Sequence, residues 1–195
     1  MNYISAYTFV IQTLEDKLPR HYYYHNPPHT VDVVQAAESI ARLNNMSTND
    51  IQLIRTAALL HDVGLTTTYR NHEEASVEFA RKHLPEFDYN HEQIEKIAEL
   101  IMATKMPQTP KCQLAEILCD ADLDYLGRPD YFAVSHRLRL EWIFALSYDE
   151  SLRSWYESQY SFLTEHHYFT AISRQNRNEG KQNNIDLITD LLFNS

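Results

Sequence analysis

Apolar residues recur every three or four positions along most of the chain, the spacing that places them on one face of an α-helix. No stretch alternates between apolar and polar residues as a half-buried strand would. Prolines, which break helices, fall between the apolar segments at Pro85, Pro107, Pro110 and Pro129. The pattern predicts an all-α helical bundle, with helices at about 3–18, 30–43, 48–63, 71–84, 90–104, 112–126, 130–146, 149–165 and 183–193.

The third predicted helix has recognisable signals at both ends. Ser47 or Thr48 can accept hydrogen bonds from the free N–H groups of its first turn. Gly64 follows the apolar run that ends in His61-Asp62, and glycine readily takes the left-handed conformation that ends helices. We therefore expect this helix to stop at Gly64 through a left-handed residue.

Length and composition set the limits of the interpretation. A chain of 195 residues with three glycines and no Gly/Ser-rich linker is expected to form one domain with its own core. Cys112 and Cys119 lack the Cys-x-x-Cys spacing, so we interpret them as buried thiols in a reducing cytoplasm. The N-terminus has no basic leader and no apolar run could span a bilayer, so we expect a cytoplasmic protein that does not enter membranes.

The formal net charge of −10 disfavours one class of partner. Duplex nucleic acid is bound mainly through neutralised phosphates, so an acidic chain is a poor candidate for it. An acidic protein that binds small phosphates has to offset its own field locally, and a bound divalent cation does so. The sequence is compatible with a homo-oligomer of any number of subunits.

Three separate helical segments carry residue types that bind divalent metals. They are His29, the pair His61-Asp62, and Asp122. Imidazole and carboxylate ligands suit Mn, Mg, Ni, Co, Zn or Fe better than copper(I) or an iron–sulfur cluster. Four such ligands on an octahedral ion would leave positions for water and substrate, as catalytic metal sites require.

The order His…His-Asp…Asp resembles the signature of the HD-domain superfamily of metal-dependent phosphohydrolases. The stretch Tyr-His-Asn-x-x-His at 24–29 is similar to the corresponding part of the cyclic nucleotide phosphodiesterases. The resemblance covers roughly Tyr22 to Gly127. It implies a single all-α HD-type domain, with a core at about 20–127 and a C-terminal helical extension at about 128–195.

The resemblance also implies roles for individual residues. It makes His29, His61, Asp62 and Asp122 metal ligands, with Asp62 also counted as catalytic. Adjacent residues point about 100° apart on a regular helix, so His61 and Asp62 can reach one ion only if the helix end is loosened, which Gly64 permits. By the same similarity, His25 is the general acid that protonates the leaving oxygen, a task that suits the pKa of histidine.

The cluster around Asp122 contains two further aspartates. Asp120 and Asp124 cannot face the same site as Asp122, because side chains two positions apart diverge on a helix. We expect them to lie in the second shell of the site, at the surface, or at the caps of neighbouring helices.

A second metal position depends on His72. Many HD proteins add a histidine here and another after the next helix, but this chain has Met102-Ala103-Thr104-Lys105 at the second place. We therefore expect one tightly bound ion. A second ion that binds more weakly, through Asp62 and His72, stays an open alternative. Lys105 is either a substrate-binding residue that contacts phosphate or a solvated cation at a helix end.

The C-terminal part contains a segment with two interpretations. Residues 162–181 combine aromatics and cations, and they either wall the substrate pocket or form a packing helix with a basic exposed face. Trp142 and Trp155 are interpreted as core residues.

Taken together, the sequence predicts a metal-dependent hydrolase of a phosphodiester or phosphomonoester, with a nucleotide or cyclic nucleotide as substrate. Two alternatives stay open. Some similar HD-fold proteins use a diiron site to oxidise substrates with O₂, and the missing histidine near Thr104 weighs against that reading. The other alternative is a noncatalytic, metal-stabilised, nucleotide-sensing module.

Overall fold

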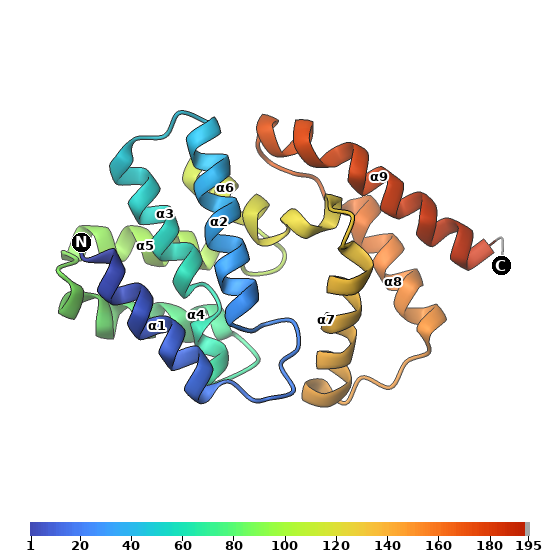
Figure 1. Ribbon diagram of the computed structural model, residues 1–195, viewed down its shortest axis with the longest axis horizontal. Helices are drawn as coiled ribbons and strands as arrows, with labels where there is room; N and C mark the ends of the chain where they lie inside the picture. Colours follow the sequence, from blue (N-terminus) through green and yellow to red (C-terminus); the bar gives the residue numbers. More distant parts are fainter. Residues whose placement is uncertain (194–195) are drawn as a thin grey trace.

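A computed structural model describes residues 1–193 of the chain. Within these residues every regular element is a helix, which confirms the all-α prediction (Figure 1). The α-helices are α1 (Tyr3–Lys17), α2 (Pro27–Leu43), α3 (Thr48–Leu60), α4 (His72–His83), α5 (His91–Ala103), α6 (Gln113–Asp122), α7 (Tyr131–Leu146), α8 (Leu152–Glu165) and α9 (Ala171–Phe193). Three short 3₁₀ turns lie between them: η1 (Val63–Thr66), η2 (Leu84–Phe87) and η3 (Asp124–Gly127). None of the described helices is long and apolar enough to cross a bilayer.

Helix starts follow local side-chain chemistry. Asn26, Ser47 and Asn90 each accept a hydrogen bond from a backbone N–H of the first turn of α2, α3 and α5. Asn90 and Gln93 form a reciprocal capping box. The predicted cap at Ser47 is therefore confirmed, and the Asn26 cap fixes the start of the helix that carries His29.

The first six α-helices surround one apolar core. Helix α3 lies at its centre, packed against α2, α5 and α1, and Ile54, Ala57 and Leu59 are fully buried (Figure 1). Because a buried leucine in such a position is held on all sides, truncating Leu59 to alanine would cost about 2–5 kcal/mol. This rigid centre delivers the His61-Asp62 pair at the C-terminal end of α3.

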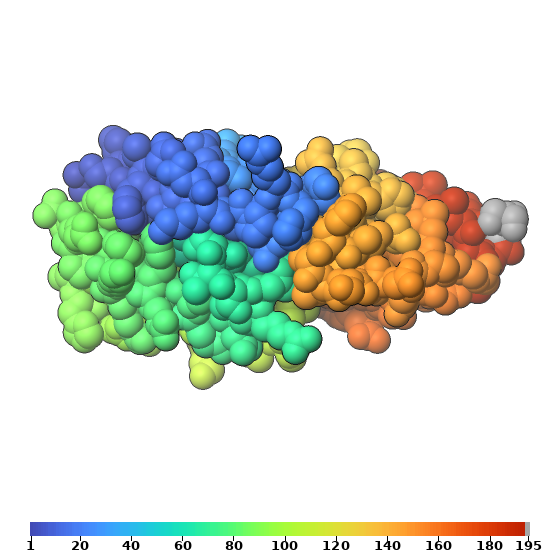
Figure 2. Space-filling model, turned by 90° about the horizontal axis from the view of Figure 1, so that it is seen from below, coloured from blue at the N-terminus to red at the C-terminus, as the bar shows by residue number. Residues whose placement is uncertain are grey.

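Helices α7, α8 and α9 form a second group beside the first. Its own apolar cluster includes Tyr131, Leu163 and Ile188, all at 0% exposure. The space-filling view shows an elongated molecule with the N-terminal helices at one end and the C-terminal helices at the other (Figure 2). Turn η3 joins the two groups in the chain and packs against α9.

The last helix is longer than the sequence predicts. Helix α9 begins at Ala171, although the apolar pattern indicates a helix only from about 183. Residues 171–182 are mostly polar, so their spacing gives no helical signal. Tertiary contact stabilises this half instead: a Cβ on Gly180 would lie 2.1 Å from the carbonyl oxygen of Gly127, so only glycine allows α9 to cross η3 this closely. The helix predicted at 149–165, by contrast, starts later than expected, at Leu152.

Candidate metal centre

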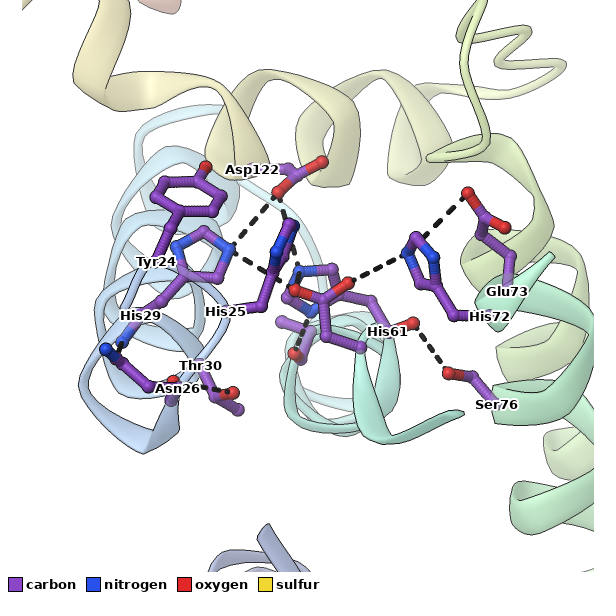
Figure 3. Close-up of polar contacts among 12 residues, drawn as sticks. Tyr24, His25, Asn26, His29, Thr30, His61, His72, Glu73, Ser76 and Asp122 are labelled. Atoms are coloured by element: carbon purple, nitrogen blue, oxygen red, sulfur yellow. Dashed lines mark hydrogen bonds and ion pairs between the residues drawn. The ribbon is translucent and has the colours of Figure 1, made fainter. Parts of the chain in front are cut away.

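Three helices bring the predicted ligands to one place. His29 lies in the first turn of α2, His61 follows the last residue of α3, and Asp122 is the last residue of α6. Figure 3 shows these three side chains pointing toward one another. One nitrogen or oxygen from each lies within 4.8 Å of the others, an arrangement that could hold a metal ion.

Asp62 lies against the same group. Its Oδ2 atom lies 3.1 Å from His61 Nε2 and 3.5 Å from His29 Nε2. Asp122 Oδ1 faces the same two nitrogens, at 3.4 Å from His61 and 3.6 Å from His29. Three of these four separations exceed the usual length of a hydrogen bond, and His29 Nε2, His61 Nε2 and Asp62 Oδ2 have no hydrogen-bond partner. Two imidazoles therefore meet two carboxylates without a well-formed hydrogen bond among them.

The end of α3 is loosened so that His61 and Asp62 can face one site. His61 keeps helical backbone angles, whereas Asp62 has φ −106° and ψ 2°. The Ser76 hydroxyl donates to the carbonyl of His61 at 2.7 Å and accepts from the N–H of Gly64 at 2.8 Å, which fixes the turn. The prediction that a loosened helix end lets both side chains converge agrees with this geometry.

The predicted role of Gly64 was wrong. No glycine in the described chain has a positive φ, so α3 does not end through a left-handed glycine. Gly64 lies instead in η1 against the start of α4, where a Cβ would meet the carbonyl oxygen of His72 at 2.0 Å. Glycine is needed there for close approach of two backbones. This contact places His72 beside the site.

Hydrogen bonds to the backbone orient two of the histidines. His61 Nδ1 lies 2.7 Å from the carbonyl oxygen of Ala58, and His72 Nδ1 lies 3.1 Å from that of Tyr69. A carbonyl can only accept, so each Nδ1 carries the proton and donates. Each Nε2 is then the atom that faces Asp62, and on losing its proton it can offer a lone pair to a metal ion, which is how ligand histidines are commonly held.

The electrostatics of the site follow from burial of opposite charges. Burial by itself would lower the pKa of His61, but the facing carboxylates of Asp62 and Asp122 outweigh it and hold the pKa well above the usual value. The pKa of His29 is raised for the same reason. Burial would raise the pKa of Asp122, yet the two histidines lower it to about 2. Such a site attracts cations because its carboxylates are ionised and buried. Without a metal ion, the cations are the protons on the histidines.

The donor set fits a divalent metal. His29 Nε2, His61 Nε2 and Asp62 Oδ2 are buried polar atoms without any hydrogen-bond partner. Burying such atoms unpaired costs roughly 1–3 kcal/mol each, so a structure that collects three of them at one point needs a ligand to satisfy them. Neutral imidazole nitrogens and carboxylate oxygens suit borderline and hard divalent ions.

His72 lies on the far side of Asp62 from His29. Its Nε2 atom lies 3.3 Å from Asp62 Oδ1 and 3.6 Å from Glu73 Oε1. One oxygen of Asp62 thus faces His29 and His61, and the other faces His72. Figure 3 shows His72 beside Glu73, away from His29. Burial would lower the pKa of His72, but Asp62 and Glu73 raise it to about 9. Glu73 is a buried neighbour that the sequence analysis did not single out.

His25 is held by a residue that sequence reasoning missed. Its Nδ1 atom forms a short hydrogen bond with Oε1 of Glu141, a fully buried residue of α7. The other oxygen of Glu141 accepts from the backbone N–H groups of Tyr24 and His25, both at 2.9 Å. Tyr69 donates its hydroxyl to the same carboxylate at 2.9 Å. Four donors therefore converge on one carboxylate, and the C-terminal helices help to build the site.

The only sequence signal for Glu141 is weak. It is a lone acidic residue within the apolar run from Leu138 to Phe144. Such a residue is equally typical of a solvated helix face. Nothing local in the sequence connects it to His25, which lies 116 residues earlier.

A pocket of about 610 Å³ opens onto this centre. Its lining includes His25, Asp62, His72 and Asp122, and its opposite wall comes from α7 and α8. Lys105 also lines the pocket, but its ammonium donates to Glu74 in a short ion pair and to Asn71 at 3.1 Å. The structure therefore brings Lys105 to the pocket in a paired state.

Asp120 and Asp124 lie outside the metal group, and neither is at the surface. Asp120 is fully buried and accepts from the backbone N–H groups of Phe169 and Thr170, just before α9. Asp124 forms a two-pronged ion pair with Arg177, at 2.7 and 3.0 Å. Of the alternatives expected for these two residues, burial excludes the surface position. Both aspartates tie the C-terminal helices to the helix that delivers Asp122.

The segment 162–181 contributes to the pocket and also packs, but Arg177 and Lys181 are paired rather than part of a basic exposed face. Phe162 lines the pocket, whereas Arg177 binds Asp124 and Lys181 donates to the carbonyls of Leu163 and His166 at the end of α8. Trp155 is fully buried as predicted. Trp142 is half-buried and lines the pocket, so its prediction as a core residue was incomplete.

Comparison with known proteins agrees with this architecture. Residues 28–124 match the HD domain family, and the chain belongs to that family. An uncharacterized protein of Clostridium beijerinckii is 36% identical over 81 residues. That alignment covers 40% of this chain and 51% of the relative, so the match extends over about half of the relative's length.

Two solved structures share the fold. Bacillus subtilis YpgQ, solved in complex with ADP, has a TM-score of 0.70 and 19% identity, over 97% of this chain and 93% of that one. A predicted HD superfamily hydrolase from an uncultured Thermotogales bacterium has a TM-score of 0.64 and 19% identity, over 95% and 90% of the two chains. At this level of identity the likeness establishes the fold, which includes the C-terminal helices.

Proposed function

We propose that this protein is a metal-dependent phosphohydrolase that cleaves a small phosphodiester or phosphomonoester, with a nucleotide or cyclic nucleotide as substrate. The observation that supports this most strongly is the group of unpaired, buried ligand atoms of His29, His61 and Asp62, beside a pocket that Asp62 and Asp122 line. The ADP in the structure of Bacillus subtilis YpgQ is consistent with a nucleotide as ligand. A net charge of −10 favours a small substrate over duplex nucleic acid.

His29, His61, Asp62 and Asp122 would hold the ion, drawn from Mn, Mg, Ni, Co, Zn or Fe. When bound, such an ion supplies Lewis-acid polarisation of a phosphoryl oxygen and lowers the pKa of water toward 7. The neighbouring residues keep the ligands in place: the Ala58 carbonyl fixes the ring of His61, and Asn26 caps the helix turn that carries His29. A second, weaker ion would use the other oxygen of Asp62 together with His72.

His25 would donate a proton to the leaving oxygen. The Glu141 carboxylate accepts from Nδ1, which leaves the Nε2 edge of His25 for the pocket that this residue lines. Tyr69 and two backbone N–H groups share the same carboxylate and limit its motion. A general acid held in this way typically contributes about 10²- to 10⁴-fold to the rate. Lys105 could contact phosphate only by giving up its present partner, Glu74.

The test is a hydrolysis screen on purified protein supplied with Mn²⁺, Mg²⁺, Ni²⁺ or Co²⁺ in turn. Bis(p-nitrophenyl) phosphate and p-nitrophenyl phosphate report diesterase and monoesterase activity separately. We expect turnover of at least one ester that EDTA abolishes, that returns with metal, and that is lost in His61→Ala. If the metal-loaded protein releases no product from these esters or from nucleotides, a noncatalytic module is the better interpretation. Oxygen consumption without phosphate release would favour the diiron oxygenase.

A further inference from the structure

The pocket above the metal centre has two walls of different chemistry. One wall carries the ionisable groups at the ends of α3, α4 and α6. The wall supplied by the C-terminal helices is largely apolar: Leu138 and Trp142 come from α7 and Phe162 from α8, with Ser158 and Gln159 as its polar members. The three apolar side chains are half-buried, so they keep apolar surface open to the pocket. Concave apolar surface facing a few polar groups is the usual form of a small-molecule site.

Trp142 is fixed in its position on this wall. Its ring packs edge-on against Trp155, with centroids 5.5 Å apart and planes at 89°, and against Tyr148 at 5.7 Å. Trp155 is fully buried and holds this pair of rings in place. A rigid aromatic side chain with one surface open to a pocket binds the apolar or flat part of a ligand at little entropic cost.

The charge of the pocket limits how many phosphates it can accept. Its lining contains the carboxylates of Asp62, Glu73 and Asp122 and a single lysine, Lys105. That lysine is already neutralised by Glu74. The imidazoles of His25 and His72 already face the carboxylates of Glu141 and Asp62. No lysine or arginine of the lining is left unpaired, so a second phosphate, away from the metal, would bring uncompensated negative charge into this enclosed space.

We propose that the pocket binds an ester with a single phosphate whose leaving group carries a flat, uncharged ring, and that Leu138, Trp142 and Phe162 form the subsite for that ring. A nucleoside monophosphate, either as a monoester or as a cyclic diester, has this chemistry. The inference rests on the proposed function, because the phosphate must sit at the metal for the ring to reach α7 and α8.

The test is a binding measurement that does not depend on turnover. Isothermal titration calorimetry of the Mn²⁺-loaded protein compares AMP, ribose 5-phosphate, which lacks the ring, and ADP, all at the same free Mn²⁺ concentration. Stacking of one base on an aromatic side chain gives about 10-fold or more in affinity. We therefore expect AMP to bind at least about 10-fold more tightly than ribose 5-phosphate, and more tightly than ADP.

Variants test whether the apolar wall of α7 and α8 causes the preference for AMP over ribose 5-phosphate. Trp142→Ala should reduce the ratio of AMP affinity to ribose 5-phosphate affinity about 10-fold, and Trp142→Phe should largely restore it. Phe162→Ala provides a second test in case Trp142→Ala fails to fold. Phe144→Ala is the matched control, because Phe144 is an exposed aromatic of the same helix, 60% accessible and outside the pocket, and its replacement should leave the ratio unchanged.

The outcomes separate this inference from the proposed function. Equal affinities for AMP and ribose 5-phosphate, or a ratio that neither Trp142→Ala nor Phe162→Ala alters, would overturn the ring subsite. Tighter binding of ADP than of AMP would overturn the single-phosphate requirement. If the ring preference holds but the metal-loaded protein hydrolyses neither AMP nor cyclic AMP nor the nitrophenyl esters, the hydrolase function fails and the subsite stands.

Discussion

Replacing Asp120 by asparagine separates the structural aspartate from the ligand two positions later. Asp120 is fully buried and accepts three hydrogen bonds: from the N–H of Phe169 at 2.7 Å, and from the N–H and hydroxyl of Thr170 at 2.8 and 2.7 Å. An amide keeps one acceptor oxygen and turns an NH₂ group toward a donor, so one or two bonds to a charged group are lost. At about 1.5–3 kcal/mol for each such bond, the free energy of unfolding should fall by about 2–4 kcal/mol. For a chain of this size the melting temperature should fall by roughly 5–15 °C.

The assay pairs urea unfolding of the metal-free protein with metal analysis of the folded protein. Asp120→Asn should lose stability yet bind metal normally while folded, because its carboxylate faces α9 and not the metal centre. Asp122→Asn should change the stability of the metal-free protein by only about 1 kcal/mol, while metal affinity falls at least about 10-fold. Asp16→Asn, at an exposed position of α1, is the control and should stay within about 0.5 kcal/mol of the wild type. The reasoning is refuted if Asp120→Asn is as stable as wild type, or if folded Asp120→Asn loses metal as Asp122→Asn does.

Further predictions concern the general acid and the protons of the site. His25→Ala should lower kcat about 10²- to 10⁴-fold on an ester with a ribose alkoxide leaving group, cost little on a nitrophenyl ester, and leave metal content unchanged; an equal loss on both esters would make His25 a binding or structural residue. Glu141→Gln should show the same dependence on the leaving group with a smaller effect, a decrease in kcat of about 10-fold on the ribose ester. If the variant loses metal instead, the role assigned to Glu141 is wrong. Metal affinity should rise with pH from 6 to 8, because ions must displace protons from His29 and His61, whose pKa values are raised. Calorimetry in buffers of different ionisation enthalpy should detect those protons, and an affinity independent of pH would contradict the assignment.

The sequence predicted most of the fold because local signals were strong. Apolar spacing located the helices, and Ser47 marked the start of α3 as expected. The prediction from sequence failed where tertiary contacts outweigh local helix preference. The polar first half of α9 is helical because Gly180 lets it pack on η3 and because Asp120 binds the two N–H groups just before it.

The candidate site was predictable to the same extent. His29, His61 and Asp122 each lie at one end of a helical segment and carry a chemically specific side chain, so their pattern indicates a metal group without any structure. Glu141 gave no comparable signal, since its partner His25 lies 116 residues away and only the packing of α7 brings them together. The packing of Gly64 against His72 is equally invisible to helix rules, because it depends on how closely two backbones approach.

The central claim is that His29, His61, Asp62 and Asp122 share one divalent ion. The most direct measurement is an anomalous difference map from crystals of the protein grown with Mn²⁺. We predict one strong peak within about 2.0–2.3 Å of His29 Nε2, His61 Nε2 and an oxygen of each aspartate. A map without a peak at this point, or with its strongest peak bound by His72 and Glu73 alone, would contradict the claim.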